Sequence, residues 1–184
     1  ADQSGANYTA SDLIVAVKAG VKPTLSSTQM TFKHKMSRIV IDVTNESGFD
    51  ITNIVIKGAV GTGVLDPATG NFTAKADAEA SDLIANTATA NKVYYALLVP
   101  QNGVKLMVTV TTADGKKRTQ TLGTADFKSG ENRRMECNVQ PADIEVKFSG
   151  PITGWVDGDD LLPDGEGEVE TPTVEWGGVK YEIV

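Results

Sequence analysis

Apolar and polar residues alternate along much of this chain, in short runs that turn residues separate. Successive side chains of a β-strand point to opposite faces of a sheet, so alternation with a period of two predicts half-buried strands. Residues 93–99 are instead almost continuously apolar and end at Pro100, which predicts a strand buried on both faces. The other predicted strands are residues 13–17, 30–36, 39–43, 51–57, 106–111, 118–122, 134–139 and 144–148.

Turn signals separate these runs at intervals of roughly 8–12 residues, a spacing typical of a β-sandwich. Asp114-Gly115 between two alternating runs predicts a hairpin, and residues 66–71 combine Pro and Gly in a second turn. Residues 74–92 are rich in Ala, Asp, Asn and Thr and predict a loop or a short helix. The fold class that we predict is all-β, an antiparallel β-sandwich.

Composition divides the chain into three parts. Residues 1–10 are small and polar and predict a flexible lead-in, and residues 11–156 hold the predicted sandwich domain. Residues 157–184 change to Asp, Gly, Pro and Glu, which predicts an acidic linker. This extension ends in a strand-like alternation over residues 179–184 that has no obvious partner in the sequence.

The net charge of −7 lies almost entirely in the C-terminal extension. Residues 157–184 carry nine acidic residues and one basic residue, whereas residues 1–156 carry 15 acidic and 16 basic residues. Neither part has the concentrated basic face of a nucleic-acid-binding protein, so we expect no nucleic-acid partner.

Cys137 is the one cysteine, so no intramolecular disulfide is possible, and we expect it to be a small core residue. No apolar run approaches the length of a membrane-spanning helix, about 18 residues or more. The first residues are small and polar and do not begin with Met, which suggests an exported chain whose signal segment has been removed.

His34 is the one histidine, and it lies in the run Met30, Phe32, His34, Met36, which alternation places on the inward face of a strand. A catalytic histidine would need a nucleophile and an orienting carboxylate, and Ser37 lies on the opposite face of that strand. One His and one Cys give no zinc-ligand spacing. We therefore interpret His34 as a buried structural histidine.

Other candidate chemistry is weaker. The acidic stretch that begins at Asp157 has Leu161 and Leu162 where a calcium loop needs an oxygen ligand and a glycine. Trp155 and Trp176 are candidate aromatic contacts for a sugar, although their linker setting favours packing or anchoring. We expect no catalytic residues, no metal and no cofactor.

Five segments, in order, resemble the fimbrillin family, the subunits of type V pili in Bacteroidales-type bacteria. Residues 32–41 (FKHKMSRIVI) are similar to a strand pair of that family, and residues 12–16 (DLIVA) are similar to its lead-in strand. Residues 95–101 (YALLVPQ) resemble its mid-domain strand, residues 127–132 (FKSGEN) a turn before a strand, and residues 152–155 (ITGW) its closing motif.

The resemblance implies a sandwich of transthyretin-like (Greek-key) type, export as a lipoprotein to the outer membrane, and assembly on the cell surface by strand exchange. The only membrane contact implied is a lipid anchor absent from this chain. Val179, Tyr181 and Ile183 are then the candidate donor strand, because alternate side chains fill pockets when a strand is added to a neighbour's sheet. Family subunits typically carry two sandwich domains, so we expect an accessory, tip or anchor subunit rather than a stalk subunit.

The sequence therefore favours a non-enzymatic structural or adhesive subunit, whose partners are other fimbrial subunits or copies of itself. One alternative is a monomeric surface lipoprotein that binds glycan or host protein through the loops of the sandwich, with Trp155 or tyrosines lining a concave site. An enzyme would need His34 exposed in a pocket beside a hydroxyl or a carboxylate.

Overall fold

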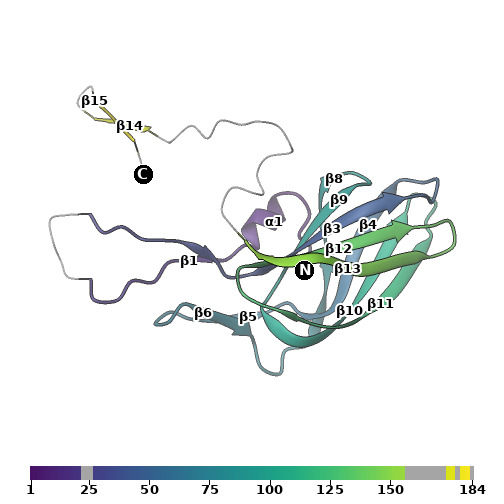
Figure 1. Cartoon of the computed structure of the whole chain (residues 1–184), viewed down its shortest axis with the longest axis horizontal. Helices are drawn as coiled ribbons and strands as arrows, with labels where there is room; N and C mark the ends of the chain where they lie inside the picture. Colours follow the sequence, from purple (N-terminus) through teal and green to yellow (C-terminus); the bar gives the residue numbers. More distant parts are fainter. Residues whose placement is uncertain (22–26, 156–172, 177–178, 183–184) are drawn as a thin grey trace.

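The computed structural model of the chain describes residues 1–21, 27–155, 173–176 and 179–182. Two larger sheets form a sandwich-like body, and three smaller hairpins and one short helix, α1 (Ala6–Ala10), accompany it (Figure 1). This outcome confirms the predicted all-β class with its antiparallel, sandwich-like sheets.

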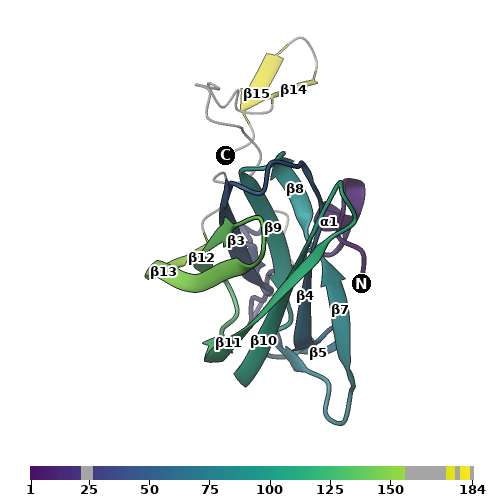
Figure 2. The same cartoon turned by 90° about the vertical axis from the view of Figure 1, so that its right-hand side faces the viewer.

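One sheet has four strands, which lie side by side in Figure 2. In spatial order they are β11 (Lys117–Phe127), β10 (Gln101–Thr112), β4 (Ile51–Val60) and β7 (Ala80–Ile84). The other sheet has five strands, in the order β13 (Ile144–Gly154), β12 (Glu131–Val139), β3 (Ser37–Asn45), β9 (Val93–Leu98) and β8 (Asn86–Thr89). β12 and β3 run parallel, whereas every other strand pair in the described ranges is antiparallel.

The three hairpins are β1 (Ile14–Val15) with β2 (Lys33–His34), β5 (Gly63–Asp66) with β6 (Asn71–Ala74), and β14 (Thr173–Trp176) with β15 (Val179–Glu182). We call the described residues 13–21 and 27–35, which contain β1 and β2, the arm. The arm extends away from the sandwich in Figure 1. We call β14 and β15 the tail hairpin.

The core lies between the two larger sheets and consists of alternate residues of their strands. Ile39 and Ile41 of β3 and Met135 and Cys137 of β12 are all fully buried in it. A second, smaller cluster forms around Met36, Leu97 and Val99, and partly buried residues from several other segments pack against it. These residues are Tyr8, Leu13, Phe72, Ala74 and Trp155.

The turn predictions are confirmed, since Asp114-Gly115 joins β10 to β11 and residues 66–71 join β5 to β6. The prediction for residues 74–92 is wrong, because this stretch forms β7 and β8 rather than a loop or a helix. Both strands lie at sheet edges, where one neighbouring strand supplies the pairing and a regular apolar pattern is not required.

The predicted inward face of residues 30–36 is also wrong in part. Met30 and Phe32 are 40% and 58% exposed, whereas Met36 is buried. The strand pairing covers only residues 33–34, so the alternation upstream of it faces solvent on the arm instead of a core.

Two glutamine side chains bridge the sheets on opposite sides of the sandwich. Gln3 donates its backbone N–H to the Ile84 carbonyl of β7 (3.1 Å), while its side-chain amide both donates to and accepts from the backbone of Leu97 in β9 (2.8 Å each). Gln120 of β11 makes the same pair of bonds with Val146 of β13 (2.9 and 2.6 Å). Each amide thus replaces a missing strand partner at a sheet edge.

The segment that was predicted as a lead-in supplies the first of these bridges. Gln3 is only 2% exposed, and the Ile84 N–H donates to the Ala1 carbonyl at 2.9 Å. Asp2 forms a parallel bridge with Ile84, so residues 1–3 cover the end of the β7 edge.

Gly58 forms an irregularity in the pairing of β4 with β7, between Ile56 and Ala59. Its φ is +96°, a conformation that side chains with a Cβ rarely adopt, and a Cβ at this position would meet the Lys105 carbonyl oxygen. A side chain here would therefore strain both the backbone and its contact with β10.

We expect Gly58→Ala to lower the free energy of unfolding by about 2 kcal/mol or more, measured by urea denaturation followed by circular dichroism. Gly123→Ala is the matched control, because Gly123 lies in β11 and a Cβ there meets no atom within 4 Å. Equal stability of the two variants would show that the irregularity at Gly58 does not require glycine.

Candidate functional site

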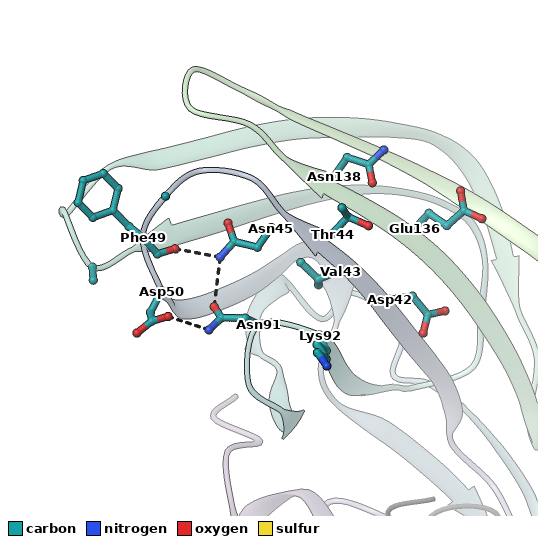
Figure 3. Close-up of a pocket in the computed structure, with 12 residues that line it drawn as sticks. Asp42, Val43, Thr44, Asn45, Phe49, Asp50, Asn91, Lys92, Glu136 and Asn138 are labelled. Atoms are coloured by element: carbon teal, nitrogen blue, oxygen red, sulfur yellow. Dashed lines mark hydrogen bonds between the residues drawn. The ribbon is translucent and has the colours of Figure 1, made fainter.

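The loops at one end of the sandwich surround a hollow of about 1050 Å³, which we call the loop-end hollow. Residues of β3 and β12 form its floor, and the loops after β3, β8 and β10 form its rim (Figure 3). Most of the residues that line it have polar side chains, and Phe49 is an exposed aromatic residue at the rim.

Asn91 holds the rim of this hollow together. Its backbone has a φ of +59°, a left-handed conformation that Asn tolerates better than most residues. Its side-chain oxygen accepts from the Ile51 N–H (2.7 Å) and from the Asn45 amide (3.2 Å), and its own amide donates to Asp50 (2.8 Å). Figure 3 shows Asn91 between Asn45 and Asp50, so its side chain joins the loop after β8 to the loop after β3, 41 positions away at Asp50.

The charged residues of the floor are paired within the protein. Asp42 accepts from Arg134 at 2.7 Å, and Glu136 lies 3.0 Å from Lys147. The Lys147 pKa is raised, mainly because its ammonium group hydrogen-bonds to Glu136. With the carboxylates of its floor paired and an aromatic ring at its rim, this hollow suits a polar ligand better than a metal ion.

A second site lies where the arm meets the body. His34 Nδ1 and Asp12 Oδ2 are 2.7 Å apart, and these side chains are only 11% and 12% exposed. The His34 ring stacks on Trp155, with ring centroids 3.8 Å apart and planes 5° from parallel. These contacts tie the end of β2 both to the segment before β1 and to the residue that follows β13.

The stack continues from Trp155 into the body. The Arg38 guanidinium lies 5.0 Å from the centroid of the Trp155 ring and 5.5 Å from that of Tyr95, and its Nε donates to Asn132 Oδ1 at 2.7 Å. Tyr8 packs against Tyr95, and burial raises the pKa of the Tyr8 hydroxyl. Arg38 is thereby a buried cation held between aromatic rings on the outer face of the five-stranded sheet.

His34 meets part of the condition for a catalytic histidine, because it lies beside a carboxylate and lines a hollow. However, its ring is nearly buried and stacked on Trp155 rather than exposed. Ser37 donates its hydroxyl to the Glu131 carbonyl at 3.4 Å. The contacts of His34 are those that a structural histidine would make, and this role remains a prediction.

The hollow beside His34 has a volume of about 360 Å³, and we call it the arm-base hollow. Its lining comes from the arm, from the turn between β11 and β12, and from Trp155. The lining residues are Phe32, Lys33, His34, Lys35, Ser129, Gly130 and Trp155. Trp155 therefore does line a concave site, but its ring is already in contact with His34 and Arg38.

The C-terminal candidates are placed only in part. Val179 and Tyr181 lie in β15 and Trp176 lies in β14, whereas Ile183 and the acidic stretch at Asp157 lie outside the described residues. β15 has a partner that the sequence did not indicate, because Val179 pairs with Trp176 and Tyr181 with Val174. The proposed donor strand is thus one half of a hairpin.

The described residues hold little that suggests reactive chemistry. They contain no group of three or more His, Cys, Asp or Glu side chains placed to hold a metal ion. Burial raises the pKa of the Cys137 thiol to about 12, so it stays protonated near neutral pH. No helix in these ranges has the length and apolar character needed to cross a membrane.

Sequence reasoning missed Asn91, Arg38 and the two bridging glutamines, Gln3 and Gln120. Asn91 in a polar stretch was a detectable signal, because Asn is enriched at left-handed turn positions. Arg38 and Gln3 gave no such signal, since their partners Trp155 and Leu97 are far away in the sequence.

Comparisons with known proteins agree with this architecture. A family model described as Fimbrillin-like matches residues 1–155. A candidate cell adhesion protein from Bacteroides ovatus has a solved structure that matches with a TM-score of 0.58 and 19% identity, over 71% of this chain and 49% of that one. A candidate cell adhesion protein from Bacteroides uniformis matches with a TM-score of 0.56 and 14% identity, over 69% of this chain and 53% of that one.

At these identities, the two solved structures support the fold alone. The matched part of each covers about half of its length. No curated protein matches the sequence significantly.

We expect Trp155→Ala to lower the free energy of unfolding by about 2 kcal/mol, because it removes the ring that joins His34 to Arg38. Urea denaturation measures the change. Phe32→Ala is the control, since Phe32 lines the same hollow but is 58% exposed, and we expect an effect within about 0.5 kcal/mol. Equal losses in the two variants would contradict a structural role for the stack.

Proposed function

The chain belongs to the Fimbrillin-like family, and on that premise we propose that it is a structural or adhesive subunit of a cell-surface fimbria that assembles by strand exchange. The family is one of fimbrial and adhesion proteins rather than enzymes, and membership implies a location at the cell surface and association with fimbrial subunits. The mode of assembly, the identity of the partners and the place of the subunit in a fimbria are the proposed part.

The observation that carries the proposal is the separation between the sandwich and the tail hairpin. The last described strands, β14 and β15, form a two-stranded sheet of their own, while the two larger sheets contain nine strands that all precede Trp155. The tail hairpin is thus an additional β element, beyond those that build the body.

A two-stranded hairpin is at best marginally stable by itself in water, because neither strand has a second neighbour. Addition to another sheet would supply main-chain hydrogen bonds, and alternate side chains would provide specificity. In this proposal the donor positions are Val179, Tyr181 and Ile183. Because β15 pairs with β14, donation requires either that β15 leaves β14 or that the hairpin docks as a unit.

The finer expectations from the sequence belong to the same proposal. They are a transthyretin-like (Greek-key) sandwich, a position as an accessory, tip or anchor subunit, and attachment to the outer membrane through a lipid anchor. β3 and β12 are parallel neighbours in the five-stranded sheet, and all four strands of the other sheet lie between them in the sequence. The chain therefore passes to the other sheet and back between these two strands, which supports the proposed Greek-key type of connection.

A second candidate function is supported by the loop-end hollow. The paired carboxylates of its floor, the amide side chains at its rim and the exposed Phe49 ring suit a glycan or a polar loop of a host protein. In that case the protein would act as a monomer, and the tail would contribute nothing to association.

Deleting residues 170–184 tests the proposed assembly. We expect the full chain to self-associate in sedimentation velocity experiments and the deletion variant to sediment as a monomer, because it lacks the donor strand. The nine strands of the body should keep the same circular dichroism spectrum in the region of β-structure. A full chain that remains monomeric, or a deletion variant that associates equally well, would contradict strand exchange and favour the second candidate.

A further inference from the structure

The floor of the loop-end hollow is a polar platform on the outer face of the five-stranded sheet. β3 and β12 are parallel neighbours, and their register pairs Asp42 with Glu136 and Thr44 with Asn138. Side chains two positions apart on a strand share a face, and the residues that alternate with these four pack in the core. The four side chains therefore point outward from two adjacent strands (Figure 3).

Two members of this platform are available to a ligand. The carboxylates of Asp42 and Glu136 are already paired with cations. In the part of the chain that the structure describes, the Thr44 hydroxyl and the Asn138 amide have no hydrogen-bond partner. An amide side chain offers both donors and an acceptor, and a hydroxyl can act as either. These two groups can therefore exchange hydrogen bonds with the hydroxyl groups of a ligand.

The rim above the platform is held in place by hydrogen bonds within the chain. The Ser47 hydroxyl donates to Asn45 Oδ1 at 2.7 Å, and the Asn45 amide donates to the Phe49 carbonyl at 2.9 Å. The Ala113 N–H donates to the Asp50 carbonyl at 2.8 Å. The loop that carries Phe49 and Asp50 is thus fixed before a ligand arrives, which lowers the cost of ordering it on binding.

The rim and the platform together present the groups that a sugar needs. A sugar has hydroxyl groups that donate and accept, and patches of C–H that pack on an aromatic ring. The Phe49 ring is 48% exposed at the rim and can receive such a patch. Asp50 Oδ1 accepts from the Asn91 amide at 2.8 Å, which leaves Oδ2 to accept from a ligand hydroxyl.

The strand order disfavours an extended peptide as the ligand. A peptide that adds to a sheet binds through main-chain hydrogen bonds at an open strand edge. The floor strands β3 and β12 are inner strands of the five-stranded sheet, and each has a strand neighbour on both sides. The floor thus offers side chains but no open edge, which suits a sugar better than an extended peptide.

The charges of the lining distinguish between classes of glycan. The lining presents three carboxylates and one ammonium group, that of Lys92. Two of these carboxylates pair with Arg134 and Lys147, but neither cation is among the residues that line the hollow. A sialylated or sulfated glycan would bring its negative charge against the carboxylates, whereas a neutral glycan would not.

From these features we infer that the loop-end hollow binds a neutral glycan, with a sugar ring packed on Phe49 and hydroxyl groups bonded to Thr44, Asn138 and Asp50. This inference rests on the second candidate function and deepens it, because it names the class of ligand. It is independent of assembly through the tail, since no residue of the tail hairpin lines the hollow.

Binding of the full chain to an array of oligosaccharides, each in a neutral and a sialylated form, tests the class of ligand. Isothermal titration calorimetry then compares the neutral oligosaccharide that binds most strongly with its own sialylated form. We expect the neutral form to bind and the sialylated form to bind at least about fivefold more weakly, because its carboxylate meets the carboxylates of the lining.

Substitutions test the site itself. We expect Phe49→Ala and Asn138→Ala each to raise the dissociation constant about five- to tenfold, because each removes one ligand contact. The matched controls are Phe32→Ala and Asn102→Ala, which alter exposed residues of the same types that do not line the hollow, and we expect no change in affinity. Circular dichroism verifies that every variant is folded.

The outcomes separate this inference from the proposed assembly. A full chain that self-associates through its tail but binds no glycan overturns the inference and leaves assembly standing. Glycan binding by a full chain that stays monomeric supports the inference and contradicts strand exchange. Stronger binding of the sialylated form overturns the neutral class, although the second candidate function stands. Glycan binding that Phe49→Ala and Asn138→Ala leave unchanged overturns the site.

Discussion

A strand at the edge of a β-sheet carries backbone N–H and C=O groups without a strand partner, and in this protein glutamine side chains satisfy several of them. An amide side chain offers one donor and one acceptor at a separation close to that of a peptide group, so it can replace one step of a strand pairing. Gln3 does this for Leu97, Gln120 for Val146 and Gln101 for Val60. The first two also join the sheets to each other, one on each side of the sandwich.

The packing of the two sheets depends on these glutamine bridges. The apolar core needs both sheets held face to face, and bridges at both sides keep β7 beside β9 and β11 beside β13. The arm has a different kind of attachment, through the stack of His34, Trp155 and Arg38 at its base. Its outer part keeps large apolar residues exposed to solvent, among them Met30 and Phe32.

Local patterns in the sequence predicted much of the body. Asp114-Gly115 predicted the β10–β11 hairpin, and the apolar run before Pro100 predicted a strand buried on both faces, as β9 is at Ala96, Leu97 and Leu98. In both cases the signal and its consequence lie in the same short segment. The strands β7 and β8 were missed because edge strands can be polar on both faces. Met30 and Phe32 were misplaced because alternation shows which residues share a face, but not whether anything covers that face. The bridges of Gln3 and the stacking of Arg38 depend on partners more than ninety and more than a hundred positions away, respectively, which no local pattern encodes.

Hydrogen exchange of backbone amides at increasing protein concentration tests most directly the claim that residues of the same chain satisfy these edge groups. The N–H groups of Ile84, Leu97 and Val146 already have partners within the chain, so their protection should be high and independent of concentration. Amides of the tail hairpin should gain protection as the chains associate. Protection at Ile84, Leu97 and Val146 that is low in dilute solution and rises with concentration would contradict the account, because it would show that these groups gain their partners only when chains associate.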